Sequence, residues 1–238
     1  MSAERTNEHG QPIGAALPDW QPPPAPQHAA LEGRWSRLEP LAPERHAGPV
    51  FDAHAEAPDG RAWTYMGYGP FASARDYEEW MSAACSGSDA LFFAIYDKDA
   101  RRWAGVASFL RIQPALGSIE VGHVSYAPCL QRTRAGSEAM YLLMRHAFEL
   151  GYRRYEWKCD ALNAASRAAA LRYGFRFEGV FRQSMVYKGR NRDTAWYALL
   201  DGEFEGVRER FEAWLAPENF DAHGRQRTPL TAAQDPRS

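Results

Sequence analysis

The segment between residues 117 and 150 constrains the fold more than any other part of the chain. Its first part, GSIEVGHVSYAP, alternates as a β-strand does, and its last part, SEAMYLLMRHAFELG, has helical apolar spacing from a start near Gly136. The polar loop between them carries Gln131, Arg132 and Arg134. A helix start presents unpaired N–H groups and the positive end of the helix dipole. The segment therefore predicts an anion site, suited to a pyrophosphate.

Composition narrows the class of protein. The 238 residues, 45% of them hydrophobic and 13% aromatic, suffice for one well-buried domain, and the net charge of −2 favours neither nucleic acid nor an anionic membrane as partner. Cys85, Cys129 and Cys159 are widely spaced, and the histidines form no metal-like pair, so we assign no disulfide framework and no metal. The longest apolar run, residues 90–96, is too short for a membrane span, and the N-terminus lacks a signal-peptide core. We expect a cytoplasmic protein.

The chain divides into three parts by composition. Residues 1–33 hold six prolines between Pro12 and Pro26 and few aliphatic residues, which predicts an extended or disordered arm. Residues 34–216 have globular patterning and form the predicted domain. Residues 217–238 form a C-terminal tail.

Within the domain, strands and helices are predicted from periodicity and from turn and cap residues. The helices at 43–55, 74–84 and 163–173 are supported by Pro43 in the first turn and by the caps Ser73 and Asn163. Residues 188–196, KGRNRDTAW, are interpreted as a loop entering the last strand. The order predicts an α/β (α+β) domain with helices packed on a largely antiparallel sheet. The predicted strands are 34–38, 90–96, 103–112, 117–126, 153–159, 175–182 and 194–200, and the remaining helices are 136–150 and 203–215.

Two polar features each have a structural and a functional interpretation. Glu120 lies within a strand, where a carboxylate is costly to bury without a partner. It therefore either faces solvent or is held in a cleft, where it would serve as a general base for an amine. Asn163 either only caps its helix or also directs its amide at a ligand, with Ser166 one turn further on.

Two further segments also have a structural and a functional interpretation. Arg190 and Asp193, in the polar segment 188–196, belong to a solvated loop or line a substrate mouth. Trp63, Tyr65 and Tyr68, in WTYMGYGPF, are packing residues or the wall of a binding cleft.

Taken in order, several stretches carry a family resemblance. They are GRWSRLEPL, WTYMGYGPF, GSIEVGHVSYAP, the long run that starts QRTRAGSEAM and ends RYGFRFEG, and KGRNRDTAW. Together they resemble the GNAT superfamily of acyl-CoA-dependent N-acyltransferases, in its RimJ/RimL-like branch, over residues 33–203. The resemblance implies the GNAT fold: a mostly antiparallel central sheet, splayed at the acyl-CoA site, with helices on both faces.

The resemblance also implies where the donor, acetyl-CoA or another acyl-CoA, binds. The family's loop, Gln/Arg-x-x-Gly-x-Gly/Ala, corresponds to residues 131–136, with Arg134 in place of the first glycine and as an added cation near the phosphates. Backbone N–H groups of residues 132–137 would hold the pyrophosphate, and the pantetheine arm would lie beside residues 125–127, in a splay against residues 155–159. The implied binding residues are Ser125, Tyr126, Ala127, Gln131, Arg132, Thr133, Arg134, Ala135, Gly136, Ser137, Asn163 and Ser166.

The implied reaction is direct attack of an amine on the thioester. Glu120 would deprotonate the amine directly or through water, with Glu156 and Asp160 as reserve candidates, and a backbone N–H around residues 124–125 would stabilise the oxyanion. Many relatives carry a tyrosine acid at the position of Ala170; here Ser166 is its substitute, and Tyr173 should point elsewhere.

The acceptor remains open at this point. A protein N-terminal α-amine, as in RimL, would suit an open groove near residues 190–193, and a small-molecule amine would suit a closed pocket walled by residues 63–68. Succinyl-CoA is an alternative donor. A non-catalytic acyl-CoA-binding or sensing module is the alternative from another class. We expect no nucleic-acid or membrane partner and either a monomer or a homodimer.

Overall fold

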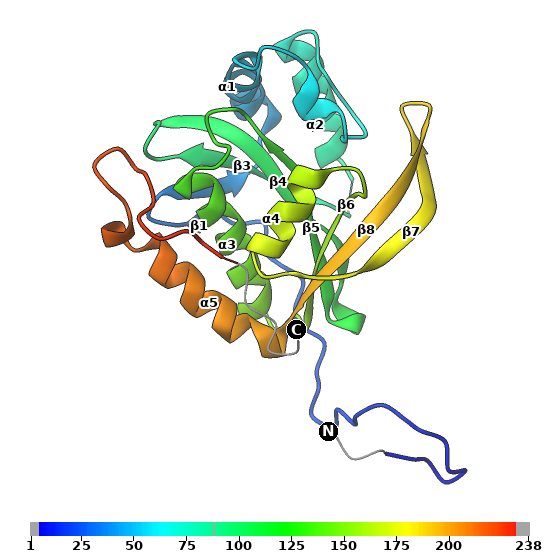
Figure 1. Cartoon of the computed structure of the whole chain (residues 1–238). Coiled ribbons are helices and arrows are strands. Elements are labelled where there is room, and N and C mark those ends of the chain that lie inside the picture. The colour runs from blue at the N-terminus through cyan, green and yellow to red at the C-terminus, as the bar shows by residue number, and fades with distance from the viewer. Residues whose placement is uncertain (1–4, 88, 232–238) are drawn as a thin grey trace.

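A single twisted sheet forms the centre of the molecule (Figure 1). The computed structural model describes residues 5–87 and 89–231. Within them the sheet has eight strands in the order β1-β2-β3-β4-β5-β6-β8-β7. All neighbouring strands are antiparallel except β5 and β6, which are parallel. The strands are β1 (Leu31–Glu32), β2 (Ser36–Pro40), β3 (Leu91–Asp97), β4 (Arg102–Gln113), β5 (Ser118–Tyr126), β6 (Arg154–Asp160), β7 (Arg176–Tyr187) and β8 (Arg190–Leu200).

Helices cover both faces of this sheet, which confirms the predicted mixed α/β architecture. One face carries α1 (Pro43–Ala55) and α2 (Ala74–Cys85), and the other carries α3 (Arg134–Glu149) and α5 (Asp201–Leu215). The short α4 (Ala164–Arg172) packs on β6 and β7. None of the helices in the described ranges combines the length and apolar character that crossing a membrane requires.

The period-two alternation of β3 shows how one strand serves both cores. Phe93 and Ile95 belong to the larger core, together with α3 and α5, whereas Phe92 and Ala94 belong to the smaller core under α1 and α2. Since successive side chains of a strand point to opposite faces, the apolar run that the sequence shows at this place is a strand buried on both sides.

The helix starts follow from local capping. Ser73 Oγ accepts from the N–H of Asp76 at 3.2 Å, and Asn163 Oδ1 accepts from the N–H of Ser166 at 3.0 Å, as predicted. The start of α3 differs from the prediction: it begins at Arg134 rather than at Gly136. Thr133 is the cap, because its Oγ1 accepts from the N–H of Gly136 at 3.0 Å.

The polar segment 188–196 is not the loop that the sequence suggested. Strand β8 begins at Arg190 and pairs with β7 from Tyr187 onward, and the two strands form a hairpin that projects past the sheet (Figure 1). Lys188 (φ 50°) and Gly189 (φ 70°) make the two-residue turn, since a tight hairpin turn of this hand requires positive φ. The turn contacts the segment between α1 and α2, where Lys188 Nζ donates to the carbonyl of Trp63 at 2.7 Å.

Both segments that flank the predicted domain contact it. In the N-terminal one, Nε2 of His28 lies 2.6 Å from the carbonyl oxygen of Phe92 on β3. Inside the domain, the buried carboxylate of Glu138, on α3, accepts from the N–H groups of Arg34, Trp35 and Ser36 at 2.9, 2.7 and 2.6 Å, and so fixes the entry into β2.

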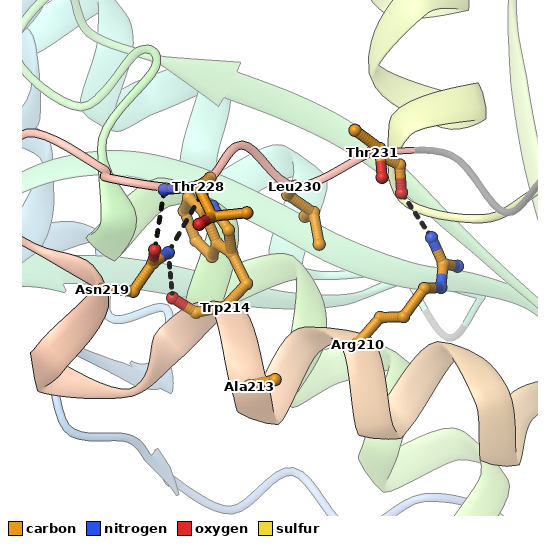
Figure 2. Close-up of a pocket in the computed structure, with 7 residues that line it drawn as sticks. All are labelled: Arg210, Ala213, Trp214, Asn219, Thr228, Leu230 and Thr231. Carbon is orange, nitrogen blue, oxygen red and sulfur yellow. Dashed lines mark hydrogen bonds between the residues drawn. The ribbon is translucent and has the colours of Figure 1, made fainter.

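The C-terminal segment folds back along α5, as Figure 2 shows. Leu230 is buried there, and Asn219 holds the segment through hydrogen bonds with Trp214 O and with both backbone groups of Thr228. A pocket of about 310 Å³ remains between the segment and the helix.

Candidate active site

Strands β5 and β6 separate halfway along their length. Their parallel pairing runs only from Ser118 opposite Arg154 to Val121 opposite Trp157. Beyond this point β5 stays paired with β4, and β6 stays paired with β8, so the edges that face each other are free. The divergence coincides with a bulge in β5, where His123 (φ 50°) and the next residue oppose Ala107 alone. We call this opening the β5–β6 split.

The loop after β5 lies at the outer end of the split and is held by its own side chains. Gln131 Nε2 donates to the carbonyl of Tyr126 at 2.9 Å, and Arg132 adopts the left-handed conformation with φ 61°. A Cβ at Gly136 would lie 2.6 Å from the carbonyl oxygen of Leu130, so glycine is required for this close approach. The N–H groups of the first two residues of α3 have no intrahelical acceptor. The loop and helix start, residues 131–137, thus have the geometry that suits an anion, and we call them the anion cradle.

Arg134 does not contribute the free cation that the sequence suggested. Its guanidinium stacks over the ring of Trp35 at 3.5 Å and lies 5.0 Å from that of Phe220. It also donates to both carboxylate oxygens of Asp99, at 2.7 and 3.0 Å. Asp99 therefore offsets the positive charge of Arg134. The contacts of Arg134 hold α3 to the sheet and to the C-terminal segment. Its backbone is helical, so the loop keeps its geometry without the family's glycine.

On the other side of the split, the start of α4 is held by the side chains expected to face the donor. Ser166 Oγ accepts from the indole N–H of Trp157 at 3.0 Å. Burial raises the pKa of the neighbouring Cys159 thiol, and a hydrogen bond with Ser166 partly offsets this. Ala170 is buried, and Tyr173 packs on Trp157 and on the ring of Phe211 in the core.

Glu120 lies on the face of β5 opposite to α3 and is almost fully buried, with 4% of its side chain exposed. Its Oε2 forms two ion pairs of 2.7 Å, with Arg111 on β4 and with Lys158 on β6. Its Oε1 has no hydrogen bond within the described residues and lies on the side of Gly122, since a Cβ there would be 3.7 Å away. The carboxylate therefore keeps one oxygen toward the widening part of the split.

Glu156 and Asp160 share this face but are already engaged. Lys158 also pairs with Glu156 at 2.8 Å, and its ammonium lies 3.7 Å from the ring centre of Trp196. Burial would raise the pKa of Glu156, but hydrogen bonds from Lys158 and Arg154 outweigh it and lower the pKa. Asp160 accepts from the hydroxyl of Tyr187, on the hairpin, at 2.8 Å. Glu120 and Glu156 are register partners, each one residue before the last pair of β5 and β6, so their position along the strands does not distinguish them; what distinguishes Glu120 is its free Oε1.

The aromatic segment 63–68 is divided between two places. Trp63 is buried in the smaller core, and Tyr68 stacks on Trp80 with ring centres 3.9 Å apart. Only Tyr65 reaches the far side of the split, where its hydroxyl donates to the carbonyl of Leu162 at 3.2 Å. The structure thus does not bring the three residues together as a single wall.

The two polar residues of the hairpin have different surroundings. Arg190 is exposed at the start of β8. Asp193 Oδ1 accepts from the N–H of Gln183 at 2.7 Å and from the side-chain amide of Asn191 at 2.9 Å, so it stabilises the bulge at Gln183 (φ 50°).

Three residues of this region were not anticipated from the sequence. Lys158 and Arg111 complete the charge network around Glu120, and His54, near the end of α1, places Nε2 3.1 Å from the hydroxyl of Ser125. Burial lowers the pKa of His54 to about 4, which leaves the ring neutral. For Lys158 a signal existed: in YEWKCD it shares a face with Glu156, and a lysine between carboxylates in a strand suggests an ion pair. For His54 and Arg111 no local signal exists.

The comparisons with known proteins agree with this geometry. The family model described as acetyltransferase (GNAT) domain matches residues 37–176. The chain belongs to this family, which confirms the family that the sequence resembled.

Solved structures show the same likeness over most of the chain. A GCN5-related N-acetyltransferase from Brucella melitensis is 45% identical, with a TM-score of 0.87, over 90% of this chain and 97% of its own. A probable acetyltransferase of the GNAT family from Chromobacterium violaceum ATCC 12472 is 41% identical, with a TM-score of 0.76, over 82% and 98%.

A curated relative points to one branch of the family. The ribosomal-protein-serine acetyltransferase of Escherichia coli (strain K12) is 32% identical over 116 residues. The match spans 47% of this chain and 61% of that relative.

Proposed function

We propose that the protein transfers an acetyl group from acetyl-CoA to a primary amine, in the cytoplasm. The observation that carries the proposal is the β5–β6 split, which ends at an anion cradle on a helix start. An extended acyl-pantetheine arm matches free strand edges, and a pyrophosphate matches N–H groups at a helix start.

The residues present fit such a donor. The backbone of residues 132–137 would hold the pyrophosphate, and glycine at position 136 lets the loop backbone at Leu130 approach the helix start closely. The free edge of residues 125–127 would pair with the amide groups of the pantetheine arm. Asn163 and Ser166 would lie at its thiol end, where their hydrogen bonds fix the start of α4.

The chemistry requires a proton acceptor, an oxyanion donor and a leaving thiolate. Glu120 Oε1 would take the proton of the amine, directly or through water, while Arg111 and Lys158 hold the other oxygen in place. A backbone N–H at residues 124–125, beside the bulge, would stabilise the charge that develops on the thioester oxygen. A thiol has a pKa near 8.5, so the thiolate leaves with little help, and Ser166 suffices where Ala170 replaces a tyrosine.

The acceptor that we propose is the N-terminal amine of a polypeptide. The name of the Escherichia coli relative supports this choice, and so does the hairpin of β7 and β8, which presents exposed polar groups such as Arg190 beside the site. A small-molecule amine is the second candidate. It is favoured by the contacts of Tyr65 with Leu162 and of Lys188 with Trp63, which bridge across that side of the site.

The test is CoA release from acetyl-CoA, detected with a thiol reagent, against matched panels of short peptides and small amines. Release that depends on a peptide with a free N-terminus, and is lost with the same peptide N-terminally blocked, would support the proposal. Release with small amines alone would assign the second candidate. Tight acetyl-CoA binding without release for any acceptor would contradict a transferase that uses this donor.

A further inference from the structure

A row of side chains leads from the proposed base to the hairpin of β7 and β8, on the face of the sheet opposite to α3. The ammonium of Lys158, which pairs with Glu120, lies 3.7 Å from the ring centre of Trp196, its register partner on β8. Two residues before Trp196, Thr194 Oγ1 accepts from Nε of Arg192 at 3.2 Å. Residues two apart in a strand share a face, so Arg192 lies at the outer end of the row that starts at Glu120.

The side chain of Arg192 is only partly engaged. It is half-buried, and its guanidinium lies 5.8 Å from the ring centre of Tyr187. Its two terminal nitrogens make no hydrogen bond or ion pair with any residue in the described ranges, and they keep contact with solvent. Asp160, opposite Thr194 in the sheet, already accepts from the N–H of Leu162 and from the hydroxyl of Tyr187, both at 2.8 Å. The terminal nitrogens of Arg192 are therefore left for a ligand.

The charges of the row indicate the sign of that ligand. Glu120 and Glu156, at its inner end, are both paired with Lys158. At its outer end, the ammonium of Lys188 donates to the carbonyl of Trp63 and forms no ion pair with a residue that the structure describes. The outer end thus holds two cations, Arg192 and Lys188, without a carboxylate partner of their own. Such an arrangement is complementary to a negatively charged group.

We propose that Arg192 binds a carboxylate of the acceptor, which makes the acceptor a polypeptide with an acidic residue close to its N-terminal amine. The planar guanidinium is suited to this, because it binds a carboxylate through two parallel N–H···O bonds. Arg192 would act on acceptor binding and not on the chemical step, since it lies at the far end of the row from Glu120. The assignment deepens the proposed function and rests on it.

The geometry of β8 also limits where the acidic residue lies. A strand advances by about 3.4 Å per residue, so Thr194 lies about 7 Å beyond Trp196. With the amine at Glu120, on the other side of Lys158, the guanidinium of Arg192 is about 10–13 Å away along the sheet. An extended peptide advances by the same amount per residue. The carboxylate is therefore expected on the third or fourth residue of the acceptor.

The test uses short acceptor peptides that differ in one side chain. Each has a free N-terminus, an amidated C-terminus and either Asp or Asn at the third or the fourth position, with no other charged side chain. CoA release from acetyl-CoA gives KM and kcat for each peptide. For wild type, Asp should lower the KM about tenfold relative to Asn at one of the two positions, with kcat little changed, as a charged hydrogen-bonded pair would give.

Variants of the hairpin assign the preference to one residue. Arg192→Gln should bring the ratio of the two KM values to about one, and Arg192→Lys, which keeps the charge but not the planar group, should keep part of the preference. The matched control is Arg182→Gln. Arg182 is exposed and follows Phe181, whose ring lies 4.4 Å from that of Trp196, so Arg182 points to the other face and its variant should keep the wild-type ratio.

Two results would overturn the assignment: equal KM values for the Asp and Asn peptides at both positions in wild type, or a preference that survives in Arg192→Gln. Calorimetric binding of the same peptides, with CoA present, separates this failure from a failure of the proposed function. If no peptide supports CoA release, the proposed acceptor reaction is wrong. Tighter binding of the Asp peptides that is lost in Arg192→Gln would then still assign an acidic ligand to Arg192, whereas equal or absent binding would overturn it.

Discussion

Lys158 Nζ lies 2.7 Å from Oε2 of Glu120, and this ion pair joins β6 to β5 at the place where the two strands stop pairing. Lys158 is the first residue of β6 beyond the last hydrogen-bonded pair. The charge network thus lies at the apex of the β5–β6 split. It has two separable tasks: it holds the proposed base, and it holds the two strands together.

Replacement of Glu120 tests the first task. Glu120→Gln keeps the size of the side chain but removes the proton acceptor, so kcat is expected to fall by about 10²-fold or more while acetyl-CoA binding changes little. The measurement is steady-state CoA release at saturating acetyl-CoA. Glu156→Gln is the matched control, since it alters the other carboxylate on Lys158, and it should stay within a few-fold of wild type. Equal losses in both variants would assign the effect to the network rather than to a base.

Replacement of Lys158 tests the second task. Lys158→Met leaves two nearly buried carboxylates without their shared cation, and breaking a buried pair in this way costs about 3 kcal/mol of unfolding free energy. Urea denaturation measures the loss. Each carboxylate keeps one arginine, Arg111 or Arg154, but the shared positive charge is lost. Adding Glu120→Gln to this variant should restore part of the stability, because one of the two carboxylates that the lysine balanced is then neutral. Additive losses would show that the two residues are not coupled.

Replacement of Arg132 tests the anion cradle. Its side chain is exposed and its backbone has φ 61°, so Arg132→Ala removes the charge and Arg132→Gly removes the charge and also relieves the backbone. Both variants should raise the KM for acetyl-CoA about fivefold with kcat unchanged, since the loss is one of ground-state binding. A normal KM in the glycine variant, with a raised KM in the alanine variant, would show that conformation and not charge matters there.

Stability should fall in mild acid because of buried histidines. Burial lowers the pKa of His54 from 6.5 to about 4, so between these values the unfolded chain binds a proton that the folded protein does not. This contribution is therefore intact above pH 6.5 and is lost as the pH falls toward 4, by about 2 kcal/mol at pH 5. Burial lowers the pKa of His46, His123 and His146 as well, and these act in the same direction.

Urea unfolding at pH 7 and at pH 5 measures this effect. His54→Gln should reduce the difference in unfolding free energy between the two pH values. The matched control is His223→Gln, at an exposed position, which should leave the difference as in wild type. An unchanged difference in His54→Gln would contradict the assignment to a buried neutral ring.

Elements that depend on neighbouring residues could be predicted from the sequence. The start of α1 at Pro43 and the caps at Ser73 and Asn163 are fixed within four residues of the chain, and all three were correct. The anion loop is similarly local, apart from its cap, Thr133, which moves the helix start by two residues. A mostly antiparallel sheet, splayed at one place, was implied by the family resemblance, and the structure confirms such a sheet, which opens between β5 and β6.

What was missed depends on partners far away in the chain. The sequence cannot show that Arg134 meets Asp99, 35 residues earlier, and Phe220, which lies in the segment taken for a tail. The strands predicted at 175–182 and 194–200 are shorter than β7 and β8, because the outer half of this hairpin is rich in arginine and exposed to solvent. Its strand structure depends on pairing between β7 and β8 and not on the local pattern. Glu120 was recognised as costly to bury, but neither of its two cations was identified, because Arg111 and Lys158 lie on other strands.

The separation of β5 from β6 also affects how the molecule behaves without its donor. A normal sheet has two outer edges, but this one carries two more in its interior, along which β5 and β6 do not pair with each other, from Gly122 and from Lys158 onward. Free edges are the places where strands of other chains add, and they promote aggregation. A bound donor that fills the gap would therefore act as a guard against self-association as well as a substrate, and its loss should shorten the shelf life of concentrated protein before it affects the fold.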